Sequence, residues 1–123
     1  MPYVDGYVLP VPKKNLVAYR RVSRTAGKIW REHGALQYVE AVADDIDVKW
    51  GVSFKKLVKP KAGETIMFSW IVFKSRKDRD RVNAKVMADP RLAKMMSVMQ
   101  DPKTKVFDVR RMSVGGFKYL VNV

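Results

Sequence analysis

The segment Thr65–Phe73 constrains the fold more than any other part of the chain. It is a run of β-branched and aromatic residues typical of a β-strand. Successive side chains of a strand point to opposite faces, and here both faces are apolar. One face carries Ile66, Phe68, Trp70 and Val72, and the other carries Met67, Ile71 and Phe73. This pattern predicts an inner strand of a sheet that must be covered on both sides.

Further strands and helices are predicted on either side of this segment. They are a strand at 3–11, a helix that starts at 16 and ends at Gly34, a strand at 35–43, a helix from 75 to about 88, a short helix that starts at 90 and a strand at 110–121. The order β-α-β-β-α-β predicts an α+β domain of ferredoxin-like type, with a four-stranded antiparallel sheet and helices on one face. No linker or repeat divides the chain, so we expect one domain over residues 1–123.

Two helix starts carry recognisable caps. Ser75 is followed three residues later by Asp78, which is close to a capping box. Asp89 precedes Pro90, the residue type favoured at the first position of a helix. These signals place the helix boundaries near 75 and 89.

Helices on one face leave the other apolar face of the sheet bare. A large bare apolar face is unfavourable in water, and a second copy of the same sheet is the simplest cover. Burial of ~500 Å² of additional apolar surface would favour association by ~12 kcal/mol before entropic costs. We therefore expect a homodimer.

The net charge of +13 is high for a chain of 123 residues. Such an excess attracts polyanions without specifying a fold. The Lys and Arg residues are spread over three segments, which is typical of a diffusely basic surface, although a nucleic-acid surface remains the alternative.

The connection 44–63 is long for a small domain. Apolar residues from Val48 to Phe54 alternate with Lys, Gly and Ser, which predicts an extended, half-buried ribbon or flap. The nucleic-acid alternative assigns it another role, because aromatic rings among lysines can stack on bases. Its candidate residues are Lys49, Trp50, Lys55 and Lys56.

Several functional classes lack their usual signals. The chain has no cysteine, a single histidine, no Gly-rich phosphate loop and no apolar run long enough for a membrane span. The first residues lack the layout of a secretory signal. We therefore expect a cytoplasmic protein with no metal centre, no cofactor and no membrane contact.

The candidate site consists of polar residues where apolar ones are expected. Glu40 interrupts an apolar stripe of the second strand, and Arg79 and Asn83 share a face of the second helix with valines. One hypothesis is a pocket between helices and sheet, in which Glu40 is a base or anchor, Arg79 and Asn83 bind an anionic or carbonyl group, and Tyr7 and Trp70 form the walls. The alternative is that Glu40 pairs with a cation and that Arg79 extends along its helix into solvent.

Other polar and soft side chains have structural interpretations. His33 lies at the end of the first helix, where a cation is favoured. Asp5 is predicted to pair with Arg110 or Arg111 across the dimer or the edge of the sheet. The methionines Met95, Met96 and Met99 are predicted to fill irregular gaps in the core.

Several short strings of the sequence are more specific than its periodicity. They are Tyr3-Val4-Asp5-Gly6-Tyr7-Val8, Gly34-Ala35-Leu36, Phe68-Ser69-Trp70-Ile71, Asp89-Pro90-Arg91 and Gly115-Gly116-Phe117. Over nearly the whole chain this set resembles the bacterial DUF1428 family. Ala41 occupies a position where relatives commonly carry cysteine, so no thiol chemistry is implied here.

The resemblance implies a dimeric α/β-barrel, the superfamily that also holds cofactor-free monooxygenases and NIPSNAP-like proteins. It implies a fold and no particular reaction. Together with the candidate pocket, it leads us to expect an uncharacterised protein that binds a small molecule or acts as a cofactor-free enzyme. The alternative is a basic protein associated with RNA or another nucleic acid.

Overall fold

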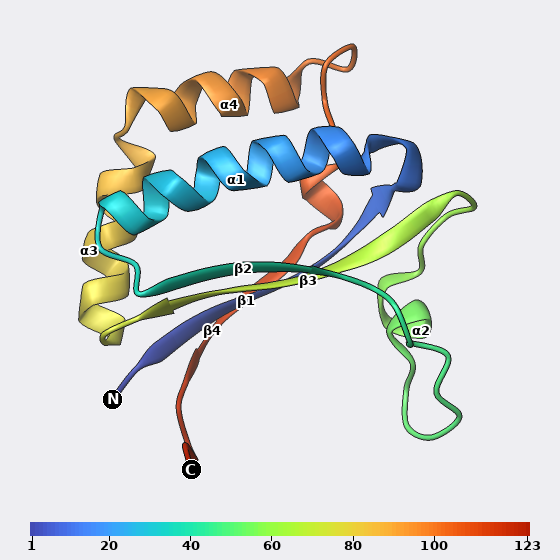
Figure 1. The fold of residues 1–123 in the computed structure, drawn as a ribbon, viewed down its shortest axis with the longest axis horizontal. Helices are drawn as coiled ribbons and strands as arrows, with labels where there is room; N and C mark the ends of the chain where they lie inside the picture. Colours follow the sequence, from blue (N-terminus) through green and yellow to red (C-terminus); the bar gives the residue numbers. More distant parts are fainter.

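The doubly apolar segment forms β3 (Glu64–Phe73), an inner strand of a four-stranded antiparallel sheet (Figure 1). The computed structural model describes all residues 1–123. The strand order is β2-β3-β1-β4, with β1 at Tyr3–Pro12, β2 at Gln37–Val42 and β4 at Ser113–Lys118. β1 pairs with β3 along its full length, from Tyr3 opposite Phe73 to Pro12 opposite Glu64. The predicted α+β, ferredoxin-like fold class is confirmed.

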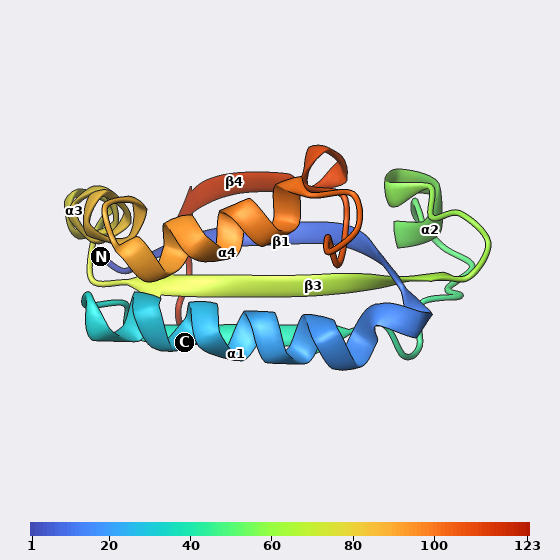
Figure 2. The ribbon, with the colours of Figure 1, turned by 90° about the horizontal axis from the view of Figure 1, so that it is seen from above.

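Three helices cover one face of the sheet (Figure 2). α1 (Leu16–Glu32) runs beside the β2 edge, α4 (Pro90–Gln100) lies over the middle strands, and α3 (Arg76–Met87) lies at one end of the sheet. No helix is both long enough and apolar enough to cross a membrane.

The side chains buried under these helices form two clusters. The first contains Ile29, Ala35, Ile71, Phe73, Val82, Val86 and Leu92. The second contains Leu9, Val11, Tyr19, Met67, Met99 and Val106. Tyr7 of β1 packs against both clusters, so it lies where they meet.

The predicted helix boundaries are confirmed by the caps. Ser75 Oγ accepts a hydrogen bond from the Asp78 backbone N–H at 3.1 Å, which begins α3. Asp89 Oδ1 accepts one from the Arg91 N–H at 2.9 Å, and Pro90 is the first residue of α4. Gly34 follows α1 with φ of +122°, a conformation that disfavours any other residue.

The second face of the sheet carries no long helix. Phe68 of β3 is 47% exposed and Phe117 of β4 is 61% exposed. Trp70 follows Phe68 by two residues on β3, so it lies on the same face. The short helix α2 (Phe54–Val58) covers one end of this face, where the rings of Phe54 and Phe68 lie 6.1 Å apart (Figure 1). We call the remainder, around Phe68, Trp70 and Phe117, the open face.

The prediction of a half-buried, extended ribbon at 44–63 is wrong. Gly51, with φ of +71°, interrupts extension, and Ser53 caps α2 by accepting a hydrogen bond from the Lys56 N–H at 3.2 Å. Trp50 is 81% exposed and Val52 is 75% exposed, so their alternation does not bury one side. In this segment the glycine turn and the capped helix determine the backbone conformation, although the alternation of apolar and polar residues predicts a strand.

The last strand is also shorter than predicted. Val109–Arg111 form a 3₁₀ turn in which Asp108 Oδ1 accepts a hydrogen bond from the Arg110 N–H at 3.0 Å. Strand β4 therefore begins only at Ser113, and it ends at Lys118.

Phe73→Ala tests the assignment of the core. Phe73 is fully buried in the first cluster, so its loss should lower the free energy of unfolding by about 3–5 kcal/mol in urea denaturation. Val17→Ala on α1, where Val17 is 75% exposed, is the control and should change it by less than about 0.5 kcal/mol. A loss below about 1 kcal/mol for Phe73→Ala would contradict this packing.

Candidate functional site

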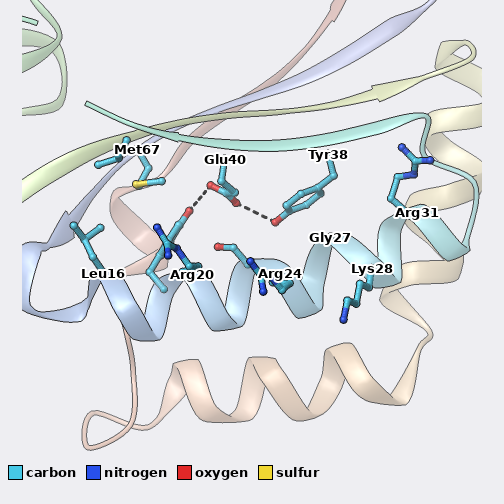
Figure 3. A pocket seen from close by; sticks show the side chains of 12 residues that line it. Leu16, Arg20, Arg24, Gly27, Lys28, Arg31, Tyr38, Glu40 and Met67 are labelled. Atoms are coloured by element: carbon cyan, nitrogen blue, oxygen red, sulfur yellow. Dashed lines mark hydrogen bonds between the residues drawn. The ribbon is translucent and has the colours of Figure 1, made fainter. Parts of the chain in front are cut away.

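Glu40 lies on the helix-covered face of β2, at the centre of a ring of hydroxyl groups (Figure 3). Tyr19 of α1 donates a hydrogen bond to Glu40 Oε2 at 2.8 Å, and Tyr38 of β2 donates one to Glu40 Oε1 at 3.0 Å. Tyr38 and Glu40 are two residues apart on one strand, so they share a face. Both carboxylate oxygens are thus held by tyrosines from two elements.

Burial is the largest influence on the pKa values of this cluster. It raises the pKa of Glu40, although the hydroxyls of Tyr19, Tyr38, Ser23 and Ser69 oppose the change by stabilising the carboxylate. Burial, followed by the charge of Glu40, raises the pKa of Tyr19 and of Tyr38. No Lys or Arg pairs with Glu40, so the prediction of a cation partner is wrong: the tyrosines take that place.

A cavity of about 320 Å³, here called the inner cavity, lies between the sheet, α1 and α4. Of its 20 lining residues, 17 are hydrophobic. The other three are Ser23, Glu40 and Ser69, which all belong to the surroundings of the Glu40 carboxyl. The inner cavity is therefore an apolar space with polar groups gathered at one place on its wall.

Methionines form much of the opposite wall. The five that line the inner cavity are Met87, Met95, Met96, Met99 and Met112. The prediction that Met95, Met96 and Met99 fill gaps in the core is incomplete, because a cavity remains beside them. Periodicity identifies an apolar helix face but does not show whether its side chains reach the neighbouring elements.

A second hollow of about 490 Å³, here called the outer cleft, lies between α1 and β2. It shares Tyr19, Ser23, Tyr38 and Glu40 with the inner cavity, so the Glu40 cluster forms the boundary between the two. Gly27 of α1 allows the close approach of Tyr38: a Cβ at this position would lie 2.8 Å from Tyr38 Cδ1.

Four basic residues of α1 line the outer cleft beside this cluster. They are Arg20, Arg24, Lys28 and Arg31 (Figure 3). From the sequence these residues are expected on the general basic surface, and neither they nor Tyr19 and Tyr38 are predicted at the site. Their spacing of three or four residues on one helix was the available signal.

Arg79 and Asn83 do not join Glu40, contrary to the prediction. Arg79 Nη1 donates to Asp5 Oδ1 at 2.7 Å, and Asn83 Nδ2 lies 3.4 Å from Asp5 Oδ2. Trp30 Nε1 donates to Asn83 Oδ1 at 3.0 Å. These side chains neutralise the buried carboxylate of Asp5 and line neither the inner cavity nor the outer cleft.

The predicted pairing of Asp5 with Arg110 or Arg111 is wrong for the same reason. Arg110 binds Asp108 with a shortest distance of 3.1 Å, and Arg111 holds both carboxylate oxygens of Glu64 at 3.0 and 2.7 Å. His33 Nε2 lies 2.9 Å from Asp89 Oδ2, so it links the end of α1 to the start of α4.

Tyr7 and Trp70 have different positions. Tyr7 lines the inner cavity, as the pocket hypothesis requires, and its pKa is raised by burial and by the charge of Asp5. Trp70 lies on the other face of the sheet, where its Nε1 is 3.3 Å from Gln37 Oε1. The prediction of Trp70 as a wall is wrong, because the helices cover the face that carries its neighbours in sequence.

The candidate nucleic-acid residues lie around α2, on the side of the sheet away from α1 (Figure 1). Trp50 is exposed, and Lys55 Nζ pairs with Asp47 at 2.7 Å; Lys49 and Lys56 are exposed near them. They do not form one surface with the cations of α1. No group of three or more His, Cys, Asp or Glu side chains is placed to hold a metal ion.

An antiparallel sheet of order β2-β3-β1-β4 with helices on one face defines a protein of the ferredoxin-like α+β class, here with a cavity between the two layers. Residues 2–109 match the family described as "Protein of unknown function (DUF1428)". The uncharacterized protein YbaA of Escherichia coli strain K12 is 37% identical over 122 residues, covering 99% of both chains. The chain belongs to the DUF1428 family.

Solved structures share the fold at low sequence identity. A NIPSNAP family protein of unknown function from Agrobacterium tumefaciens strain C58 is similar with a TM-score of 0.60 and 16% identity, covering 96% of this chain and 87% of that one. SnoaB from Streptomyces nogalater, a cofactor-independent oxygenase, is similar with a TM-score of 0.54 and 10% identity, covering 99% and 96%. These similarities establish the architecture.

Glu40→Gln tests the environment of the carboxyl. Because folding raises the pKa of Glu40, the native chain holds this proton more tightly than the unfolded chain, and stability falls as the pH rises through the unfolded value of 4.5. The free energy of unfolding of the wild type minus that of Glu40→Gln should therefore decrease between about pH 4 and about pH 8, measured by urea denaturation.

Glu64→Gln is the matched control with the opposite sign. Arg111 lowers the pKa of Glu64, so this carboxylate stabilises the fold above its unfolded value and loses that effect as the pH falls. The free energy of unfolding of the wild type minus that of Glu64→Gln should therefore increase between about pH 4 and about pH 8. A difference for Glu40→Gln that is constant with pH would contradict the assigned environment.

Proposed function

We propose that the chain binds a small, largely apolar organic molecule in the inner cavity, where Glu40 exchanges a proton with it. The observation that carries this proposal is the arrangement of the cavity wall, which is apolar except around one carboxyl of raised pKa. Cavities of about 300–1,000 Å³ with a few convergent polar groups are typical of small-molecule sites.

The hydroxyl groups around Glu40 support a proton-transfer chemistry. The raised pKa of Tyr7, Tyr19 and Tyr38 means that these phenols are protonated at neutral pH. Tyr19 and Tyr38 already donate their single O–H to Glu40, so Tyr7 is the phenol of the cavity wall that can donate to a ligand. A ligand carbonyl in the cavity can accept from such a donor while the Glu40 carboxylate removes a proton from the adjacent carbon. The ligand class that fits is an aromatic or alicyclic compound with an enolisable carbonyl or a phenol.

The catalytic form of the proposal requires no cofactor. Glu40 supplies the base and a tyrosine stabilises the developing enolate oxygen, so the proton is the only species transferred. The occurrence of this fold in SnoaB, a cofactor-independent oxygenase, supports the idea that the architecture accommodates such chemistry.

Exchange of the α-protons of 2-tetralone in D₂O, followed by NMR, tests this proposal. The wild type should accelerate the exchange over buffer with saturation, and Glu40→Gln should lower the enzymatic rate by about 10²-fold because it removes the base. Glu64→Gln, which alters a carboxyl outside both hollows, should leave the rate unchanged. Failure of 2-tetralone and of 2-naphthol to bind in isothermal titration calorimetry would overturn the proposal.

We also propose that two copies associate through their open faces. The support is physical: Phe68 and Phe117 are large, exposed and on one face of the sheet, which is unfavourable for an isolated subunit. A second copy covers this surface with an identical one, as in most symmetric oligomers.

Sedimentation velocity at about 10 µM tests the association, since stable dimers remain intact at micromolar concentration. The wild type should sediment with a molecular mass twice the 14.2 kDa of one chain. The double variant Phe68→Asp with Phe117→Asp should sediment as a monomer, because the dimer would bury unpaired charges. Val17→Asp, at an exposed apolar residue of α1, is the control and should remain dimeric. A monomeric wild type would contradict the association.

A further inference from the structure

The cations of the outer cleft have no acidic partner, unlike the five arginines of the chain that form ion pairs. Arg79, Arg81, Arg91, Arg110 and Arg111 each form an ion pair with a carboxylate of the chain. Arg20, Arg24 and Lys28 form none, and all three are exposed. Arg31 Nη1 donates to the backbone oxygen of Leu36 at 2.5 Å, which leaves its positive charge uncompensated.

These cations lie close together on one side of α1. Arg20, Arg24 and Lys28 follow one another at intervals of four residues, so they are neighbours along the helix surface. Like charges at this spacing repel one another. The arrangement therefore weakens the isolated helix and is relieved by any anion bound between the side chains.

Arg20 and Arg24 lie beside the Glu40 cluster along the outer cleft, while the Lys28 side chain points away from β2 (Figure 3). Figure 3 shows Arg20, Arg24 and Lys28 on α1, and Glu40 and Tyr38 above them on β2. Tyr19, Ser23, Tyr38 and Glu40 line both hollows, so a ligand that occupies both must pass between these four side chains. The apolar space and the cationic wall are thus adjacent parts of one site.

From this arrangement we infer that the ligand is an amphiphilic organic acid. Its apolar body lies in the inner cavity, and its carboxylate lies in the outer cleft between Arg20 and Arg24. The inference rests on the proposed binding function and adds the chemical class of the ligand. Arginine suits this role because its planar guanidinium binds both oxygens of a carboxylate.

The charge of Glu40 is compatible with an acidic ligand. Glu40 lies on the sheet side of the cleft, and the cations lie on the helix side. The ligand carboxylate binds on the helix side, away from Glu40, and the intervening apolar body passes the tyrosine hydroxyls. This orientation presents the carbons of the ligand, and not its acid group, to Glu40.

A matched pair of probes separates the two parts of the site. 1-Naphthaleneacetate and 1-naphthaleneacetamide have nearly the same shape and differ in charge. In isothermal titration calorimetry the wild type should bind the acetate about tenfold more tightly than the amide, because charge-assisted hydrogen bonds are about twice as strong as neutral ones. The preference should shrink as the salt rises from about 0.1 M to about 1 M, where the Debye length falls from about 10 Å to about 3 Å.

The variant Arg20→Gln with Arg24→Gln should remove the preference and keep the affinity for the amide. The control, Arg21→Gln with Arg76→Gln, removes the same charge from two arginines that also lack an acidic partner but lie outside the cleft. It should keep most of the preference. Circular dichroism checks that both variants are folded.

The outcomes distinguish this inference from the proposal on which it rests. Equal affinity of the wild type for both probes, or an equal loss of preference in both double variants, would overturn the acidic-ligand inference and leave the binding function intact. Absence of binding for both probes would overturn the two together. Loss of preference in the cleft variant alone supports the inference.

Discussion

Strand β3 carries apolar side chains on both faces, and the rest of the structure depends on how each face is covered. β3 pairs with β1 on one side and β2 on the other, so its side chains lie in the middle of the sheet. On one face Ile71 and Phe73 are buried under the helices. On the other face α2 covers only one end. The same strand thus supplies the core of the subunit and its exposed apolar surface.

Under the helices, the sheet is tightly packed in the two core clusters, and the inner cavity lies between them. One cluster forms around α1 and α3, and the other forms around α1 and the end of α4, with Tyr7 in contact with both. The inner cavity lies between these elements, beside the polar residues of β2 and α1. Dense packing in the two clusters holds in place the helices and strands that surround the cavity.

The sequence predicted the four strands, the helices α1, α3 and α4, the caps of α3 and α4 and the inward direction of Glu40, since each follows from local chemistry or from the period of a helix or strand. It did not predict α2. It did not identify which face of β3 the helices cover, and this error placed Trp70 in the pocket. The partners of Arg79 also escaped prediction, because Asp5 is 74 residues away and only the folded sheet brings it to α3. At 44–63, one glycine and one helix cap overrode the apparent alternation.

Under the proposed binding function, the methionine wall would determine how the inner cavity discriminates among ligands. Thioether side chains are unbranched and rotate about three bonds, so this wall conforms to many outlines. The Glu40 cluster opposite is held by hydrogen bonds from two elements and does not adapt in this way. The proposed site would therefore select ligands by the positions of their polar atoms, and it would tolerate differences in the shape of their hydrocarbon part.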